Sequence, residues 1–109
     1  MSEFFVSSKE LSRFLVDNKC VILKFSASWC RSCNNEKVKK GYEYLKNKYN
    51  DYIKFVELDI DDYEDLINNT EYYNFNIKVV PTFKIYIDGN IVSEHNDIDR
   101  LIENIEAVN

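Results

Sequence analysis

VILKFSASWCRSC, residues 21–33, is the stretch that decides the fold. Residues 21–27 are rich in β-branched and aromatic side chains and are apolar on both faces except at Lys24, which predicts a central strand covered on both sides. A long helix ending near Asn50 is predicted from Cys33 onward, because apolar residues recur at helical spacing: Val38, Tyr42, Leu45 and Tyr49. Cys30 and Cys33 therefore stand where a buried strand gives way to a helix.

The rest of the chain alternates between strand-like and helix-like patterns without a linker. The predicted elements are a strand at 4–6, a helix from the Ser7/Glu10 capping box to Asn18, a strand at 53–59, a helix from the acidic run 61–65 to Tyr72, strands at 82–87 and 91–94 around Asp88-Gly89, and a last helix at 98–108. This order, β-α-β-α-β-α-β-β-α, predicts an α/β fold of parallel strands with an antiparallel hairpin at the edge. One domain over residues 1–109 is expected.

The composition excludes several classes of function. The net charge is −5 and the basic residues are scattered, whereas nucleic-acid binders cluster Lys and Arg. No apolar run approaches the roughly 20 residues that span a bilayer. The first ten residues lack the apolar core of a signal peptide, and an odd number of cysteines, 3, does not suit a secreted disulfide scaffold. We therefore expect a cytoplasmic protein that binds neither nucleic acid nor membranes.

The pair Cys30-x-x-Cys33 predicts thiol chemistry. Unpaired N–H groups at a helix N-terminus stabilise a thiolate, which is the species that attacks disulfides. Cys30 is therefore the expected attacking thiol, with Cys33 one turn later as the resolving thiol. Half of a zinc site has the same spacing, but Cys20 stands roughly 20 Å away at the other end of the strand, and the only histidine is His95. A shared metal site is not expected, since zinc ligands lie within about 2.3 Å of the ion.

In order and spacing, the Trp29-Cys30-x-x-Cys33 junction, Val80-Pro81-Thr82 before a strand and the Asp88-Gly89 hairpin resemble the thioredoxin family over essentially the whole chain. The resemblance implies a five-stranded mixed sheet with four flanking helices. It also implies a cis Pro81 beside the active disulfide, pairing of substrate with the Val80 backbone, and Trp29 at the groove. Alternatively, Pro81 merely starts a strand and Trp29 is a packing lid.

Two departures from the family bear on the cysteines. Arg31-Ser32 replaces the usual Gly-Pro, which adds a positive charge beside Cys30. Lys24 occupies the position of the family's buried aspartate. Its amine either extends to solvent, or lies under the disulfide as a cation, or lies there neutral and acts as a base. A cationic Lys24 and Arg31 both favour thiolate and a more oxidising couple.

These observations lead to two hypotheses. In the first, the protein is an enzyme that reduces or isomerises protein disulfides through Cys30 and Cys33, without a bound cofactor and with electrons from a partner reductase. In the second, it is a binding or adaptor module that holds a partner in the Val80 groove with little redox turnover. Cys20 is expected to be a small buried residue, and His95 a surface residue.

Overall fold

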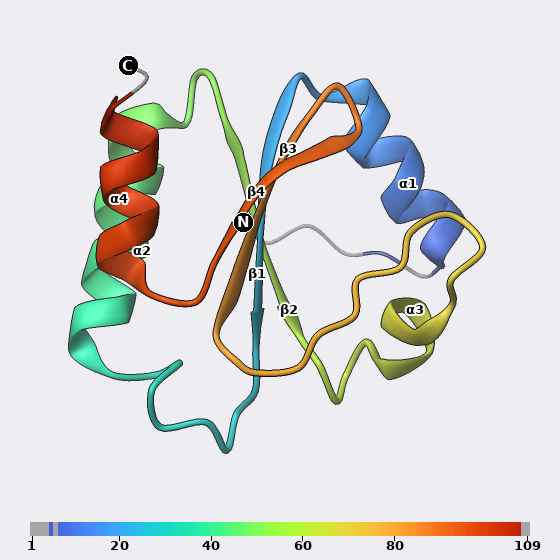
Figure 1. The fold of residues 1–109 in the computed structure, drawn as a ribbon, viewed down its shortest axis with the longest axis horizontal. Helices are drawn as coiled ribbons and strands as arrows, with labels where there is room; N and C mark the ends of the chain where they lie inside the picture. The colour runs from blue at the N-terminus through green and yellow to red at the C-terminus, as the bar shows by residue number, and fades with distance from the viewer. Residues whose placement is uncertain (1–4, 6, 108–109) are drawn as a thin grey trace.

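The computed structural model describes residues 5 and 7–107. Figure 1 shows a sheet with α2 and α4 on one face and α1 and α3 on the other, which confirms the predicted α/β layering. The elements are, in chain order, α1 (Ser8–Asp17), β1 (Cys20–Ser26), α2 (Glu36–Tyr49), β2 (Lys54–Asp59), α3 (Glu64–Asn68), β3 (Thr82–Ile87), β4 (Asn90–His95) and α4 (Ile98–Ala107).

The prediction of five strands is wrong for the described residues, whose sheet has four strands in the order β2-β1-β3-β4. Of the expected first strand, positions 4 and 6 lie outside the described residues, and Phe5 is buried without belonging to a strand. β1 is parallel to β2 and antiparallel to β3, and β3 is antiparallel to β4. The alternating pattern predicted antiparallel pairing only within the hairpin of β3 and β4, but β3 is also antiparallel to β1.

The direction of β3 is linked to the path that the chain takes after β2 (Figure 1). The helix α3 has 5 residues and ends at Asn68, not near Tyr72 as predicted. Five residues of helix rise roughly 7.5 Å, whereas a six-residue strand extends roughly 20 Å, so α3 cannot return the chain along the sheet. Residues 69–81 contain no helix or strand, and Figure 1 shows that they bring the chain back to the end of the sheet where β2 finished.

The strand β1 divides the core into two layers. Its residues alternate, so Val21, Leu23 and Phe25 pack towards α1 and α3, whereas Ile22 packs towards α2 and α4. Every residue of β1 except Cys20 is buried, as expected for a central strand. By the same alternation Lys24 shares the face of Ile22 and points toward α2, which places a charged side chain inside an apolar layer.

The predicted start of the first helix at Ser7 and the predicted hairpin at Asp88-Gly89 are confirmed. Ser7 caps α1, because its Oγ accepts the Glu10 N–H at 3.2 Å. Asp88 and Gly89 have φ values of 52° and 83° and join β3 to β4. Positive φ at both central residues is the conformation of the tight hairpin turn that matches strand twist, and glycine adopts it without strain.

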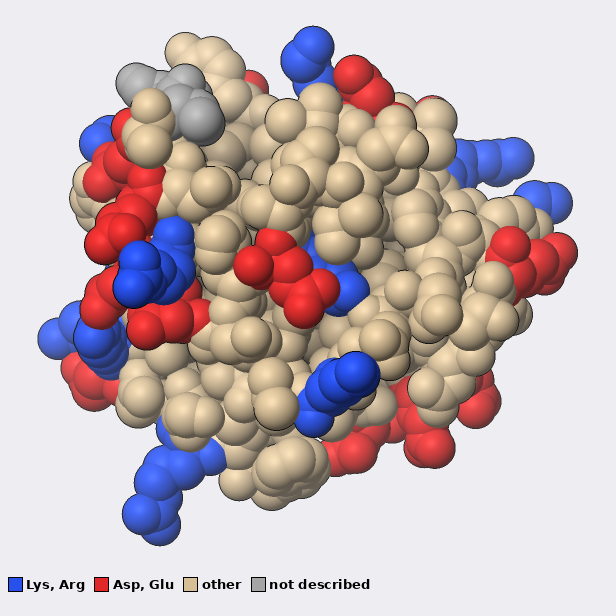
Figure 2. Space-filling model, in the orientation of Figure 1, with Lys and Arg blue, Asp and Glu red and all other residues tan. Residues whose placement is uncertain are grey.

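Charged side chains of both signs cover α2 and α4. Figure 2 shows basic and acidic groups interspersed along this side of the molecule. Lys48 pairs with Glu106, and Lys37 pairs with Asp99, which links the two helices. The lysines of α2 are therefore part of a mixed surface, not a patch of one sign. Within the described part of the chain, no helix combines the length and the apolarity needed to cross a membrane.

Candidate active site

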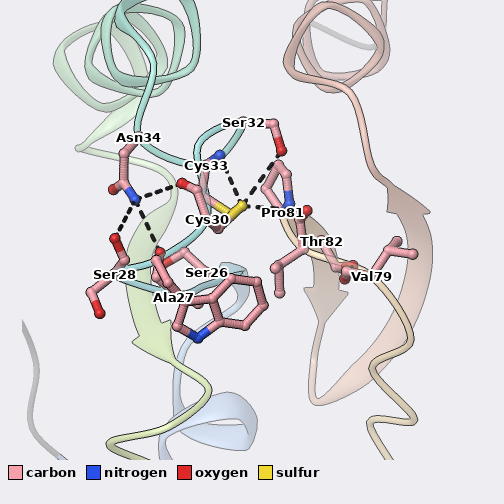
Figure 3. The surroundings of a disulfide bond; sticks show 12 residues. Ser26, Ala27, Ser28, Cys30, Ser32, Cys33, Asn34, Val79, Pro81 and Thr82 are labelled. Atoms are coloured by element: carbon pink, nitrogen blue, oxygen red, sulfur yellow. Dashed lines mark hydrogen bonds between the residues drawn. A yellow bond between two sulfur atoms is a disulfide. The ribbon is translucent and has the colours of Figure 1, made fainter.

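The loop after β1 and the segment before β3 meet at one end of the sheet. Because β1 and β3 are antiparallel, with Phe25 opposite Thr82, the end of β1 lies beside the start of β3. The cysteines follow β1, and Pro81 immediately precedes β3. Figure 3 shows Pro81 next to the sulfur atoms. The fold thus brings together two segments that are 50 residues apart in sequence at Cys30 and Val80.

Cys30 and Cys33 form a disulfide, with their Cα atoms 5.3 Å apart. The Cys33 N–H donates to Cys30 Sγ at 3.1 Å. The Ser32 hydroxyl lies 3.4 Å from the same sulfur, and the Val80 carbonyl oxygen lies 3.6 Å from it. Cys30 keeps 6% of its surface exposed, whereas Cys33 is fully buried at 0%. The N–H and O–H donors therefore point at Cys30 Sγ, which is also the more exposed of the two sulfurs.

The prediction that α2 begins at Cys33 is wrong. Residues 31–33 form a turn, and α2 begins at Glu36 after its N-cap Asn35, whose Oδ1 accepts the Val38 N–H at 2.8 Å. The N–H group that contacts Cys30 Sγ consequently comes from the turn and not from the first turn of the helix. Asparagine is a favoured N-cap residue, and this was the signal in the sequence for the true start.

Asn34 is a site residue that the sequence interpretation missed. Its side-chain Nδ2 donates to the carbonyl oxygens of Cys30 at 2.8 Å, Ala27 at 3.0 Å and Ser28 at 3.4 Å. Figure 3 shows this amide bridging the end of β1 and the cysteine turn. An asparagine that bonds nearby carbonyls competes with helix formation, which explains why the helix starts only after it.

The second wall of the site is built around Pro81. The Val80–Pro81 peptide bond is cis, as the family resemblance implied. Asn96 Nδ2 donates to Pro81 O at 3.3 Å and to Thr82 Oγ1 at 3.0 Å, and the Thr82 hydroxyl donates to Val79 O at 2.6 Å. Pro81 is buried, whereas Val79 is 56% exposed. Hydrogen bonds from β3 and from the residue after β4 therefore fix the backbone that faces the cysteines.

A groove with a volume of 810 Å³ runs between the two walls. Trp29 stands at its rim with 67% of its surface exposed, and its Nε1 donates to Asp61 Oδ2 at 2.9 Å. This exposure does not suit a packing lid, because a lid would be covered. The sequence-predicted residues that line the groove are Trp29, Cys30, Arg31 and Val80.

Lys24 does not extend freely to solvent. Its side chain is 3% exposed, and Nζ lies 3.2 Å from Glu57 Oε2 and 5.4 Å from the centre of the Tyr42 ring. Ser26 Oγ donates to the same Glu57 oxygen at 2.9 Å. The amine is therefore held within the layer between the sheet and α2 by a carboxylate and an aromatic face. Glu57 was missed because its pairing depends on strand register, where it lies opposite Lys24.

The remaining cysteine and the histidine lie elsewhere. Cys20 begins β1, at the opposite end of the strand from Cys30, and is a free thiol. It is half-buried instead of buried as predicted, and burial raises the pKa of its thiol. His95 ends β4 and is also half-buried, with a buried Nε2 that lacks a hydrogen-bond partner among the described residues. Neither residue lines the groove.

This arrangement is suited to two-electron exchange with an external disulfide. One sulfur is accessible at the floor of a groove, the second is buried directly behind it, and N–H and O–H donors surround the accessible one. A thiolate at Cys30 can attack a bound disulfide, and Cys33 is close enough to complete the exchange. Fold and site therefore define a protein of the thiol–disulfide exchange class.

Comparison with known proteins gives the family. Residues 3–107 match the thioredoxin family model, and the chain belongs to the thioredoxin family. Thioredoxin from Oryctolagus cuniculus is 30% identical over 105 residues, which cover 94% of this chain and 90% of the relative. Thioredoxin from Homo sapiens is 33% identical over 90 residues, with coverage of 83% and 76%.

Solved structures agree with this assignment. The oxidised thioredoxin of Plasmodium falciparum has a TM-score of 0.76 at 25% identity, covering 99% of this chain and 98% of that one. A thioredoxin variant from Entamoeba histolytica has a TM-score of 0.77 at 25% identity, covering 98% and 99%. The protein is thus a thiol–disulfide oxidoreductase with a Cys30/Cys33 redox pair, and the adaptor hypothesis is not favoured.

Proposed function

We propose that the protein reduces protein disulfides, with Cys30 as the attacking thiol and Cys33 as the resolving thiol. The assignment of these roles rests on the different surroundings of the two cysteines. Cys30 Sγ receives the Cys33 N–H and lies in the groove, whereas Cys33 is completely buried. A substrate can therefore reach only Cys30 without rearrangement of the site.

The reaction proceeds in two exchanges. The Cys30 thiolate attacks one sulfur of the substrate disulfide, which forms a mixed disulfide and releases the other substrate sulfur as a thiolate that takes up a proton. The Cys33 thiolate then attacks Cys30 Sγ, which forms the Cys30–Cys33 disulfide and releases the second substrate thiolate. The substrate gains two electrons and the protein loses two, so no cofactor is required within this chain.

The groove supplies the substrate contacts in this proposal. Val80 contributes backbone for strand-like pairing with an extended peptide. Trp29 and Val79 offer exposed apolar surface on either side, and Pro81 fixes the Val80 carbonyl beside Cys30. Trp29, Val80 and Pro81 therefore act as the substrate-binding residues.

Members of this family act on protein disulfides and are reduced by a reductase, so we propose a partner reductase as the electron donor. Re-reduction of the Cys30–Cys33 disulfide needs such a donor in every cycle. A cytoplasmic location fits this requirement and the free thiol of Cys20. We further propose that residues 1–109 act as one domain.

The test is reduction of insulin disulfides by the reduced protein, followed by turbidity. Wild type should reduce insulin, and Cys30→Ser should lose the activity. Cys33→Ser should instead accumulate a covalent complex with substrate that a reducing agent releases. Trapping by Cys30→Ser in place of Cys33→Ser would reverse the two roles, and inactivity of wild type would refute the proposed function.

A further inference from the structure

The groove differs in charge from the rest of the molecule. The chain has a net charge of −5. Among the described residues, the charged side chains that line the groove are Arg31 and Lys78, and both are basic and exposed. Neither forms an ion pair with a carboxylate of the described residues. The surface that receives substrate is therefore locally positive on an acidic protein.

The two cations stand on opposite walls of the groove. Arg31 follows Cys30 directly, and Lys78 precedes Val80 by two residues. Val80 O lies 3.6 Å from Cys30 Sγ, so the walls approach each other at the reacting sulfur. Because successive residues of an extended peptide are about 3.3 Å apart, the neighbours of a substrate cysteine lie within reach of both cations.

The positive region is bounded on one side. A neighbouring cavity shares Ile60 and Ile77 with the groove and contains Asp61 and Glu64. Asp61 also accepts the Trp29 indole N–H. The Asp61 carboxylate therefore stands at the Trp29 rim of the groove, whereas the charged side chains that line the groove itself, among the described residues, are basic.

From this charge distribution we infer that the preferred substrates are disulfides in acidic segments, in which Asp or Glu flanks the cysteine that Cys30 attacks. This inference rests on the proposed function. Arg31 and Lys78 contact the flanking carboxylates, while Trp29 and Val79 pack on the apolar parts of the same segment. Two exposed ion pairs increase the rate of capture, each by up to about fivefold, and the advantage weakens as salt screens it.

The experiment compares three symmetrical peptide disulfides of sequence acetyl-Gly-X-Cys-X-Gly-amide, in which X is Glu, Gln or Lys. Reduced protein is mixed with each peptide, and Trp29 fluorescence follows the second-order rate constant. Each rate is divided by the rate with dithiothreitol, an uncharged dithiol, which removes the effect of X on the intrinsic reactivity of the disulfide. The expected order is Glu, then Gln, then Lys at about 0.02 M salt, converging at about 0.5 M.

Variants locate the origin of the preference. Lys78→Gln should lower the Glu-to-Lys rate ratio by up to about fivefold, and Lys78→Glu should lower it further. Arg31→Gln should lower the same ratio, and because a ratio is taken, its effect on the reactivity of Cys30 cancels. Lys39→Gln is the matched control, since Lys39 is an exposed lysine of α2 outside the groove and carries the same change in net charge.

The outcomes separate this inference from the proposed function. Equal normalised rates for the three peptides, or a faster Lys peptide, overturn the acidic preference while reduction itself stands. A Glu preference that survives both Lys78→Gln and Arg31→Gln overturns the assignment to the groove. If the protein reduces none of the three peptides and does not reduce insulin, the proposed function is refuted. A Glu preference that Lys78→Gln and Arg31→Gln reduce and Lys39→Gln leaves intact supports the inference.

Discussion

Lys24 and Glu57 lie opposite each other on the parallel strands β1 and β2, with Nζ 3.2 Å from Oε2. The lysine is 3% exposed and the glutamate 46%, so a buried cation is balanced by a carboxylate that reaches water. The Lys24–Glu57 pair lies within the sheet, and the cysteines follow the end of the same strand, β1. A buried charge acts over a longer range than an exposed one, because solvent screens it less.

The first prediction concerns the redox potential. If the Lys24 ammonium stabilises the Cys30 thiolate, Lys24→Met should make the potential more negative and Glu57→Gln should make it less negative. A stabilisation of about 1.4 kcal/mol corresponds to about 30 mV for this two-electron couple. Arg31 acts in the same direction as Lys24, so the wild-type potential should be less negative than the roughly −270 mV of thioredoxin. Lys24→Asp should make the potential still more negative than Lys24→Met does.

The measurement is a glutathione redox titration of wild type and variants, followed by Trp29 fluorescence. Thermal denaturation of each variant serves as the folding control, since Glu57→Gln leaves a buried ammonium without its anion. Identical potentials would mean that the cysteines do not sense the charge. Shifts of the opposite sign would indicate a neutral amine that accepts a proton.

A second prediction concerns thiol reactivity in the reduced protein. Cys20 is half-buried and Cys30 only 6% exposed, so access alone favours Cys20. Burial, however, raises the pKa of the Cys20 thiol, whereas the Cys33 N–H points at Cys30 Sγ. Because the thiolate is the nucleophile, iodoacetamide near neutral pH should modify Cys30 first. Mass spectrometry of partly alkylated protein gives the order, and early labelling of Cys20 would contradict the assignment.

Local signals in the sequence predicted most of the fold. Ser7 caps α1, Asp88-Gly89 forms the hairpin turn, and the apolar spacing of α2 correctly placed its buried face and its end. These features depend on interactions within a few residues. The Cys30–Cys33 pair was found for the same reason, because both thiols lie within one turn.

The sequence-based predictions were wrong or incomplete where the structure depends on contacts between residues far apart in the chain. The antiparallel direction of β3 depends on the path of residues 69–81, which contain no helix or strand (Figure 1). The helix before them, α3, ends at Asn68-Asn69, residues that favour turns over helix. The partner of Lys24 depends on the register between β1 and β2, which no local pattern reveals. Asn34 bonds carbonyls on both sides of Trp29, and that role requires the turn to be already formed.

A third prediction concerns Asn34. Asn34→Ala removes the donor shared by three carbonyl oxygens and should lower the free energy of unfolding by about 1–2 kcal/mol, or the Tm by roughly 4–8 °C for each kcal/mol. Asn34→Asp should cost more, because a carboxylate then faces carbonyl oxygens. Asn47→Ala, at an exposed asparagine of α2, is the control. Equal Tm values for Asn34→Ala and Asn47→Ala would show that the amide does not hold the loop.

The last prediction concerns stability at alkaline pH. Tyr42 is buried against the sheet, and its hydroxyl donates to Val56 O at 3.1 Å. Burial, and secondly the Glu57 carboxylate, raise the pKa of the Tyr42 phenol well above its usual range. Above about pH 10 the unfolded chain loses this proton while the folded protein keeps it. Stability is therefore complete below pH 10 and falls as pH rises towards the folded-state pKa, by up to about 1.4 kcal/mol per pH unit.

Tyr42→Phe should remove this dependence. The variant should lose about 1 kcal/mol at pH 7, because the hydrogen bond is absent, but its stability should fall less steeply above pH 10. Urea denaturation at pH 7, 9, 10 and 11 gives the slopes, with oxidised protein in a Cys20→Ala background to prevent disulfide exchange.

Burial also raises the pKa of Tyr73 and Tyr86, so some alkaline destabilisation remains in both proteins. Tyr52→Phe, at a tyrosine that is 77% exposed, is the matched control and should keep the wild-type slope. If the stability of wild type and of Tyr42→Phe falls with pH at the same slope, Tyr42 ionises alike in the folded and unfolded states. Its phenol would then be accessible to water in the folded protein.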